Sequence, residues 1–211
     1  MSVIELDHPL IEHKLAILRD EKTGTKEFRE LIGEIASVLC YEAMKDVKLK
    51  TVEIKTPIEK MKAKKLEEDN YAFVPILRAG MGMLDGVISV IPNAKIGHIG
   101  MYRNEETFEP VNYFFKVPKG IEKREVFLLD PMLATGMSME VGYKALLGHG
   151  TPSRVHIACV IGTTQALDYL AQNMPEDTTV WCAAVDPVLN EKKYIVPGLG
   201  DAGDLCFGVK L

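Results

Sequence analysis

The sequence predicts an α/β protein with a parallel core sheet flanked by helices, and three observations favour this class. Short apolar runs recur at residues 73–77, 95–101, 126–129, 155–161 and 180–185. Helix-like stretches lie between several of these runs, at residues 82–91, 138–147 and 163–172. Strands that alternate with helices are typical of a parallel sheet. The runs are apolar throughout, which indicates strands buried on both faces.

The remaining segments are interpreted from their periodicity. Apolar residues recur at three- and four-residue spacing over residues 25–47, which predicts a helix with Thr25 as its N-cap. A shorter helix of the same kind is predicted around residues 10–18. Alternation over residues 51–55 predicts a half-exposed strand, and the aromatic segment 107–117 predicts a β-hairpin arm. The charge runs at 60–65 and 67–69 are interpreted as solvated faces.

Composition excludes several classes of protein. The chain has 211 residues, a hydrophobic content of 47% and a formal net charge of −5, which argues against a constitutive nucleic-acid or membrane-surface binder. No apolar run approaches the ~18 residues needed to span a bilayer, and the charged N-terminus does not resemble a secretion signal. The four cysteines, Cys40, Cys159, Cys182 and Cys206, stand far apart in apolar stretches. We therefore expect reduced core thiols and a soluble, cytoplasmic protein.

The strongest candidate site follows the apolar run 126–129. Asp130 ends that run, and a tight loop with Thr135, Gly136 and Ser138 then enters a helix. Small hydroxyl residues and a glycine at a helix N-terminus present N–H and O–H donors to an anion. The pattern indicates a phosphate cradle, with Asp130 placed to bind the hydroxyls of an attached sugar. On spacing alone, simple capping of a helix is an equally good interpretation.

Three further loops follow predicted strands. Arg78 stands between an apolar run and a glycine-containing turn, and its planar guanidinium suits bidentate phosphate binding. Arg103 lies in a polar turn at the base of the predicted arm. Residues 194–204 contain three glycines and a proline, which preclude a regular helix. Such a loop lets backbone N–H and C=O groups read the edge of a flat ligand.

These motifs resemble a known family. The strand, acid and Thr-Gly-x-Ser of residues 126–138 resemble the phosphoribosyl pyrophosphate (PRPP) signature of type I phosphoribosyltransferases. The form Asp-Pro-Met-Leu-Ala-Thr-Gly and the loop 194–204 are similar to those of uracil phosphoribosyltransferases, and the resemblance covers essentially the whole chain. It implies transfer of 5-phosphoribosyl from PRPP to N1 of uracil, giving UMP and diphosphate, a step of pyrimidine salvage.

The resemblance also implies site residues. Asp130, Arg78, Arg103 and Asp201 are the catalytic candidates. Uracil is expected to contact Ile195, Gly200, Asp201 and Ala202. PRPP is expected to contact Arg78, Arg103, Asp130, Pro131, Met132, Leu133, Ala134, Thr135, Gly136, Met137, Ser138 and Asp201. Mg²⁺ is expected to be bound mainly by PRPP itself, because Pro131 replaces the second acid of the usual motif, and no dedicated protein metal site is expected.

The implied architecture is the type I phosphoribosyltransferase fold in a single domain, residues 1–211. It comprises a five-stranded parallel core sheet with flanking helices, a flexible arm at about 104–118 and a small C-terminal hood with a base-binding loop at about 193–205. PRPP and uracil are the implied small-molecule partners, with no nucleic acid or membrane. We expect a homo-oligomer, a dimer or a tetramer. Activation by GTP, as in some relatives, is a property that the sequence leaves open.

Several positions depart from the family pattern. Met137 and Lys193 stand where glycine is usual, Leu205 replaces a basic residue, and residues 162–165 replace Ala-Pro-Glu-Gly. Met137 would strain the loop by about 1–2 kcal/mol if that position required a positive φ. The change to Lys193 could alter how the chain approaches the base loop. These departures leave the named ligand residues intact.

Other interpretations stay open at this point. A phosphoribosyltransferase for another base is the nearest one, and the loop 194–204 argues against it. A regulatory RNA-binding protein on the same fold is a second, against which the net charge of −5 and Pro131 stand. A catalytically inactive sensor of PRPP or uracil is the third.

Overall fold

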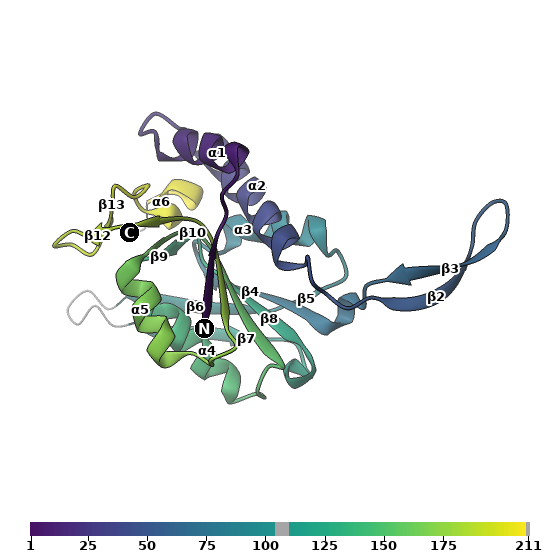
Figure 1. Cartoon of the computed structure of the whole chain (residues 1–211). Helices are drawn as coiled ribbons and strands as arrows, with labels where there is room; N and C mark the ends of the chain where they lie inside the picture. The colour runs from purple at the N-terminus through teal and green to yellow at the C-terminus, as the bar shows by residue number, and fades with distance from the viewer. Residues whose placement is uncertain (104–109, 210–211) are drawn as a thin grey trace.

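The computed structural model describes residues 1–103 and 110–209, and it confirms the predicted α/β class. One mixed sheet forms its centre (Figure 1), with the strand order β1-β11-β10-β8-β4-β6-β7. These strands are Ser2–Glu5, Thr179–Asp186, Arg154–Thr163, Glu125–Leu129, Tyr71–Leu77, His98–Arg103 and Pro110–Lys116, in that order. Two short strands pair at its side, β5 (Lys95–Ile96) with β4 and β9 (Met132–Leu133) with β10.

Neighbouring strands from β1 to β6 are parallel, and β7 alone along this path is antiparallel, to β6. All five predicted apolar runs are strands of this sheet. The expected five-stranded core is therefore extended at its edges, where β1 pairs with β11 in the register Val3 to Val180. The pairing of β6 with β7 confirms the predicted hairpin, whose segment 104–109 lies outside the described residues.

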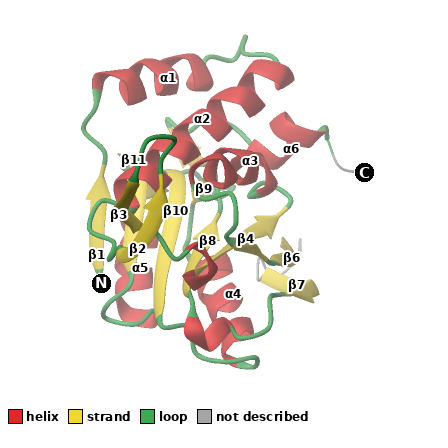
Figure 2. Ribbon diagram, turned by 90° about the vertical axis from the view of Figure 1, so that its right-hand side faces the viewer, coloured by secondary structure: helices red, strands yellow, loops and turns green. Residues whose placement is uncertain are grey.

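Helices cover both faces of the sheet (Figure 2). One face packs against α1 (Pro9–Arg19), α2 (Thr25–Ala43), α3 (Met81–Val90) and α6 (Ala202–Phe207). The other face packs against α4 (Met137–Leu147) and α5 (Thr164–Asn173). On the first face, Phe73 and Phe127 meet edge to face with ring centroids 5.4 Å apart. Two separate apolar clusters, one on each face, hold these layers together through burial of hydrophobic surface.

The helix predicted at 25–47 is correct in position but shorter. The N-cap is Gly24 rather than Thr25, which is the first helical residue, and the helix ends at Ala43. Helices α2 and α3 cross so closely that a Cβ on Gly86 would lie 2.0 Å from the carbonyl oxygen of Gly33. Glycine is therefore required at this crossing. The predicted short helix at 10–18 is confirmed as α1.

A second hairpin projects from the body of the molecule (Figure 1). It consists of β2 (Lys50–Lys55) and β3 (Lys60–Lys65), paired antiparallel. The strand predicted at 51–55 is confirmed, whereas its partner had been interpreted only as a solvated charge run. That run is largely exposed, as predicted, and it is also a strand. Two short 3₁₀ turns, at Glu68–Asn70 and Ile121–Lys123, complete the regular structure.

The C-terminal hood is formed by β12 (Val188–Leu189), β13 (Ile195–Val196) and α6. The prediction that residues 194–204 contain no regular helix is wrong at its end, because α6 begins at Ala202. The glycines at 198 and 200 precede the helix, and the Asp201 carboxylate caps it by accepting from the backbone N–H of Asp204 at 3.0 Å. No helix among residues 1–103 and 110–209 is long and apolar enough to cross a bilayer.

Candidate functional site

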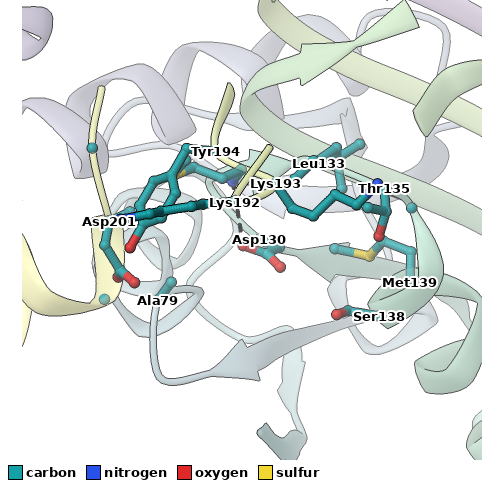
Figure 3. A pocket seen from close by; sticks show the side chains of 16 residues that line it. Ala79, Asp130, Leu133, Thr135, Ser138, Met139, Lys192, Lys193, Tyr194 and Asp201 are labelled. Carbon is teal, nitrogen blue, oxygen red and sulfur yellow. Dashed lines mark hydrogen bonds between the residues drawn. The ribbon is translucent and has the colours of Figure 1, made fainter. Parts of the chain in front are cut away.

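A cavity of about 450 Å³, referred to as the main cavity, opens at the carboxyl ends of the central strands. In an open parallel sheet, ligands bind at this edge. One side of the cavity is formed by loops that follow β4 and β8, and the other by the hood (Figure 3). Its lining residues are Ala79, Asp130, Met132, Leu133, Ala134, Thr135, Gly136, Ser138, Met139, Lys192, Lys193, Tyr194, Gly200, Asp201, Ala202 and Gly203.

The loop between β8 and α4 has the geometry of an anion cradle. Asp130 directly follows β8, and its carboxylate accepts from the backbone N–H of Met132 at 3.2 Å. Gly136 is the N-cap of α4 with φ +79°, and a Cβ there would lie 3.0 Å from the carbonyl oxygen of Ala166. A glycine is thus needed to turn the chain into the helix. The first N–H groups of an α-helix have no carbonyl partner within it, so the start of α4 beside Ser138 is suited to binding an anion.

Met137 does not strain this loop. It is the first residue of α4, and the positive φ falls on Gly136 instead. The condition under which Met137 was expected to cost about 1–2 kcal/mol is therefore not met. Its side chain lines a second, smaller cavity beside the first.

The second cavity measures about 120 Å³ and contains Arg78. It shares Ala79, Asp130, Thr135 and Ser138 with the first cavity, so the two are continuous around Asp130. The Arg78 guanidinium donates to the Asp204 carboxylate at 2.6 Å and to the Gly208 carbonyl at 3.1 Å. Both partners belong to the hood and the segment after it. Arg78 therefore joins the loop after β4 to the C-terminal region.

Gly200, Asp201 and Ala202 of the predicted base loop line the main cavity opposite Asp130. Gly200 has φ +86°. It is also exposed, so its backbone groups are accessible just before α6 begins. Arg78, Asp130, Asp201 and the residues 132–138 are thus brought together by the fold.

Two predicted residues line neither cavity, and the side chain of a third is not described. Pro131 lines neither cavity, and its carbonyl accepts from the N–H groups of Val160 and Ile161, both at 3.0 Å. Ile195 is buried beneath the loop and also lines neither cavity. The side chain of Arg103 lies outside the described residues.

Sequence reasoning assigned no role in the site to three residues around the start of the base loop. Lys192, Lys193 and Tyr194 line the main cavity on its hood side (Figure 3). Lys193 has φ +63°, the only positive φ at a non-glycine position in the described part of the chain. The two adjacent lysines could have indicated that this segment lines the site, because ammonium groups beside a phosphate cradle favour an anionic ligand.

Helix α5 supports the cradle from behind. Thr163, which is fully buried, donates to the Ala134 carbonyl at 2.8 Å and accepts from the Ala166 N–H at 3.0 Å as the N-cap of α5. Tyr169 donates to the buried Glu140 carboxylate of α4, which also pairs with Lys144. Hydrogen bonds from Lys144 and Tyr169 lower the pKa of Glu140 below its usual range. Residues 162–165, which differ from the usual family sequence, therefore connect α5 to the cradle through Thr163.

Within residues 1–103 and 110–209, no group of three His, Cys, Asp or Glu side chains is arranged to bind a metal ion. Asp130 and Asp201 are the two carboxylates that line the main cavity. A divalent cation there would need most of its oxygen ligands from a bound molecule and water.

Known proteins were compared with this chain at two levels. The family model for uracil phosphoribosyltransferase matches residues 5–209. A uracil phosphoribosyltransferase of Wolinella succinogenes is 50% identical over 210 residues, covering 100% of each chain. One from Staphylococcus epidermidis is 49% identical over 204 residues, 97% of each. The solved structure of the AQ2163 protein from Aquifex aeolicus superposes with a TM-score of 0.94 at 39% identity, covering 99% of both chains.

Proposed function

The chain belongs to the uracil phosphoribosyltransferase family, and from this premise we propose that it transfers 5-phosphoribosyl from PRPP to N1 of uracil, giving UMP and diphosphate. The observation that carries the proposal is the main cavity, which joins the cradle around Asp130 to the backbone of the hood loop. An activated sugar phosphate and a base must meet in one enclosed space for this reaction. Pyrimidine salvage is the corresponding metabolic role.

The cradle is assigned to the 5-phosphate of PRPP. Backbone N–H groups at the start of α4 and the hydroxyls of Thr135 and Ser138 would donate to its oxygens. Asp130 would accept from the ribose hydroxyls, because it lies where the two cavities join. Together these contacts fix C1 of the ribose against the base and remove the entropy cost of aligning the two.

Arg78 is assigned to the diphosphate. Its guanidinium already lies in the smaller cavity, with Asp204 and Gly208 as partners. Diphosphate would compete with the Asp204 carboxylate for the same N–H groups, so binding of PRPP exchanges one anionic partner for another. Arg103 is assigned the same ligand from the resemblance. As C1–O breaks, negative charge grows on the departing oxygen, and these cations stabilise it.

The hood loop is assigned to uracil. Backbone groups around Gly200 and Ala202, which line the main cavity, would match the acceptor, donor, acceptor order of O2, N3 and O4. Ile195, buried beneath the loop, is assigned to uracil from the resemblance alone. Cytosine presents a donor at position 4, which would leave buried partners unsatisfied at about 1–3 kcal/mol each. Asp201 is placed to orient PRPP or to polarise N1–H, and both roles stay part of the proposal. The N1–C1 bond forms as the C1–O bond breaks, the electron pair of C1–O leaves with diphosphate, and the N1 proton passes to diphosphate or water.

Mg²⁺ is proposed to enter with PRPP, bound mainly by its phosphate and ribose oxygens, with Asp130 and Asp201 as the nearest protein carboxylates in the cavity. When bound, it neutralises charge on the departing diphosphate.

Homo-oligomerisation, as a dimer or tetramer, is also proposed, and the β2–β3 hairpin supports it. One face of that ribbon carries Val52, Ile54, Met61 and Ala63, and Ile58 at its tip is 90% exposed. An isolated two-stranded ribbon is only marginally stable in water. A second subunit that covered this apolar face would stabilise the projecting hairpin. Light scattering coupled to gel filtration measures the assembly, with Ile54→Lys as the test variant. A monomeric wild type would contradict this part of the proposal.

Three finer points complete the proposal. Residues 1–211 are treated as a single phosphoribosyltransferase domain, which the two clusters on one sheet support. A cytoplasmic location is supported by four free, buried cysteines. GTP is tested as an activator by adding it to the assay below, where an unchanged rate argues against it.

The deciding experiment measures nucleotide formation from PRPP and Mg²⁺ with uracil, cytosine, hypoxanthine, guanine and orotate offered in parallel. We expect turnover with uracil alone. Turnover with a purine or orotate, or binding of PRPP with no turnover of any base, would contradict the assignment. Asp130→Asn should lose most activity while keeping the wild-type unfolding temperature. A near-wild-type kcat/KM in this variant would contradict the role of Asp130.

A further inference from the structure

The loop that precedes α6 is held by an ion pair outside the cavity. Arg19 is the last residue of α1, and Asp186 is the last residue of β11. Their side chains form two parallel hydrogen bonds, from Arg19 Nη2 to Oδ1 at 2.7 Å and from Nη1 to Oδ2 at 2.8 Å. This bidentate geometry gives the pair a fixed orientation as well as strength.

Both backbone polar groups of Gly198 are bound to this pair. Arg19 Nη1 donates to the Gly198 carbonyl at 2.8 Å, and the Gly198 N–H donates to Asp186 Oδ2 at 3.0 Å. Gly198 is itself buried, with φ +65°, and a Cβ there would lie 2.1 Å from the Ile195 carbonyl oxygen. The two peptide groups that flank the Cα of Gly198 are therefore both held by the ion pair.

We propose that Arg19 and Asp186 are positioning residues for recognition of the base. Neither side chain lines the cavities, so they act through Gly198, which lies two residues before Gly200. The inference deepens the proposed function and rests on it: backbone groups that read a base edge must be fixed before the base arrives. Without the pair, uracil would have to order the loop as it binds, and its affinity would be lower by the free energy of that ordering.

The burial of the pair makes it suited to this task. Only 6% of the Asp186 side chain and 21% of the Arg19 side chain are exposed, so water does not readily replace either partner. The three elements that meet here, α1, β11 and the hood loop, are far apart in sequence, and Arg19 and Asp186 are separated by 167 positions. If the loop moved alone, Arg19 and Asp186 would stay paired with each other, but each would lose its hydrogen bond to Gly198, which resists opening of the loop.

The test uses Asp186→Asn and Arg19→Lys, which keep size or charge but lose the bidentate pair. We expect the KM for uracil to rise about 10- to 100-fold, as for loss of hydrogen bonds to a charged group. The Kd for PRPP, measured without uracil by calorimetry, should change less than about twofold, since the cradle lies on other elements. Equal weakening of both ligands, or an unchanged KM for uracil, would overturn the proposal.

Glu125→Gln is the matched control. It breaks another partly buried pair, Glu125 with His156 at 3.0 Å, near the amino ends of the neighbouring strands β8 and β10 and away from the hood loop. A general loss of stability would affect this control and the test variants alike, whereas a positioning role moves the uracil KM only in Asp186→Asn and Arg19→Lys.

A readout independent of turnover separates this inference from the proposed function. Amide hydrogen exchange at Gly198 and Leu199 should speed up at least about tenfold in Asp186→Asn and stay at the wild-type rate in Glu125→Gln. Unchanged exchange in Asp186→Asn would overturn the positioning role. If the wild type does not turn over uracil, the function fails, and the exchange result still decides whether the pair fixes the loop.

Discussion

Replacing Thr163 by valine tests whether α5 stabilises the phosphate cradle through one hydroxyl. Thr163 is fully buried between β10 and α5, and its hydroxyl joins the Ala134 carbonyl to the Ala166 N–H. Valine has nearly the same shape but neither donates nor accepts a hydrogen bond. The substitution therefore removes both bonds without creating a cavity.

The expected loss of stability follows from the two groups left behind. Ala166 is fully buried, so its N–H loses its cap and stays without a partner, which costs about 1–3 kcal/mol. The Ala134 carbonyl lies in a half-buried loop where water can replace the hydroxyl, and its loss adds at most about 1 kcal/mol. We expect about 1–4 kcal/mol in total. At about 2–4 °C per kcal/mol for a domain of this size, the unfolding temperature falls by about 2–16 °C.

Urea unfolding of wild type, Thr163→Val and Thr163→Ser measures this loss. Serine keeps the hydroxyl and removes one methyl group, so it measures the loss of packing alone, about 1 kcal/mol. Because Ala134 lines the cavity, the KM for PRPP should also rise more than the KM for uracil in the valine variant. If Thr163→Val were as stable as the wild type, the hydroxyl would not support the cradle.

Three further predictions follow from particular contacts. Arg78→Ala should weaken PRPP and diphosphate binding far more than uracil binding, and calorimetry that finds equal losses would contradict its role. Lys193→Gly should stabilise the fold by about 1 kcal/mol, because φ is +63° there, and should weaken PRPP binding by removing a cation; urea unfolding and calorimetry measure the two effects. The pKa of Glu125 is held below its usual range by the hydrogen bond to His156, so this carboxylate stabilises the fold above its unfolded pKa and the contribution is lost as pH falls through the lowered value. Glu125→Gln should thus be less stable than wild type at neutral pH, and the difference should disappear as the pH falls through the lowered pKa of Glu125; equal stability at neutral pH would contradict this.

The strands and helices of the core could be predicted because their signal is local. A strand such as β10 is apolar along nearly its whole length, and α2 repeats its buried positions every three or four residues. The edge strand β1 carries no such signal, since all four of its residues are exposed. It is a strand only because β11 offers unpaired backbone groups beside it, which is information from the other end of the chain.

The candidate site could be predicted to the extent that its loops follow strands. The carboxyl ends of parallel strands converge, so Arg78 and Asp130 had to lie near each other once β4 and β8 were adjacent. Lys192 and Lys193 escaped this reasoning because they belong to a loop between two short strands of the hood, outside the main sheet. The Arg19–Asp186 pair could not be predicted in this way, because neither local sequence indicates which distant residue forms the ion pair.

The position of a positive φ is a third kind of information, and it depends on packing rather than on residue type. Methionine at 137 suggested strain, yet the left-handed turn falls one residue earlier, on Gly136, where the carbonyl of Ala166 leaves no room for a side chain. Lys193, a residue with no preference for this region, adopts it in an exposed loop beside the cavity. A glycine would relieve the strain at that position, so the lysine is explained only by its side chain. An ammonium group at the rim of a site for a highly charged phosphate donor offers the compensating interaction, which is why stability and PRPP binding should change in opposite directions when Lys193 is replaced by glycine.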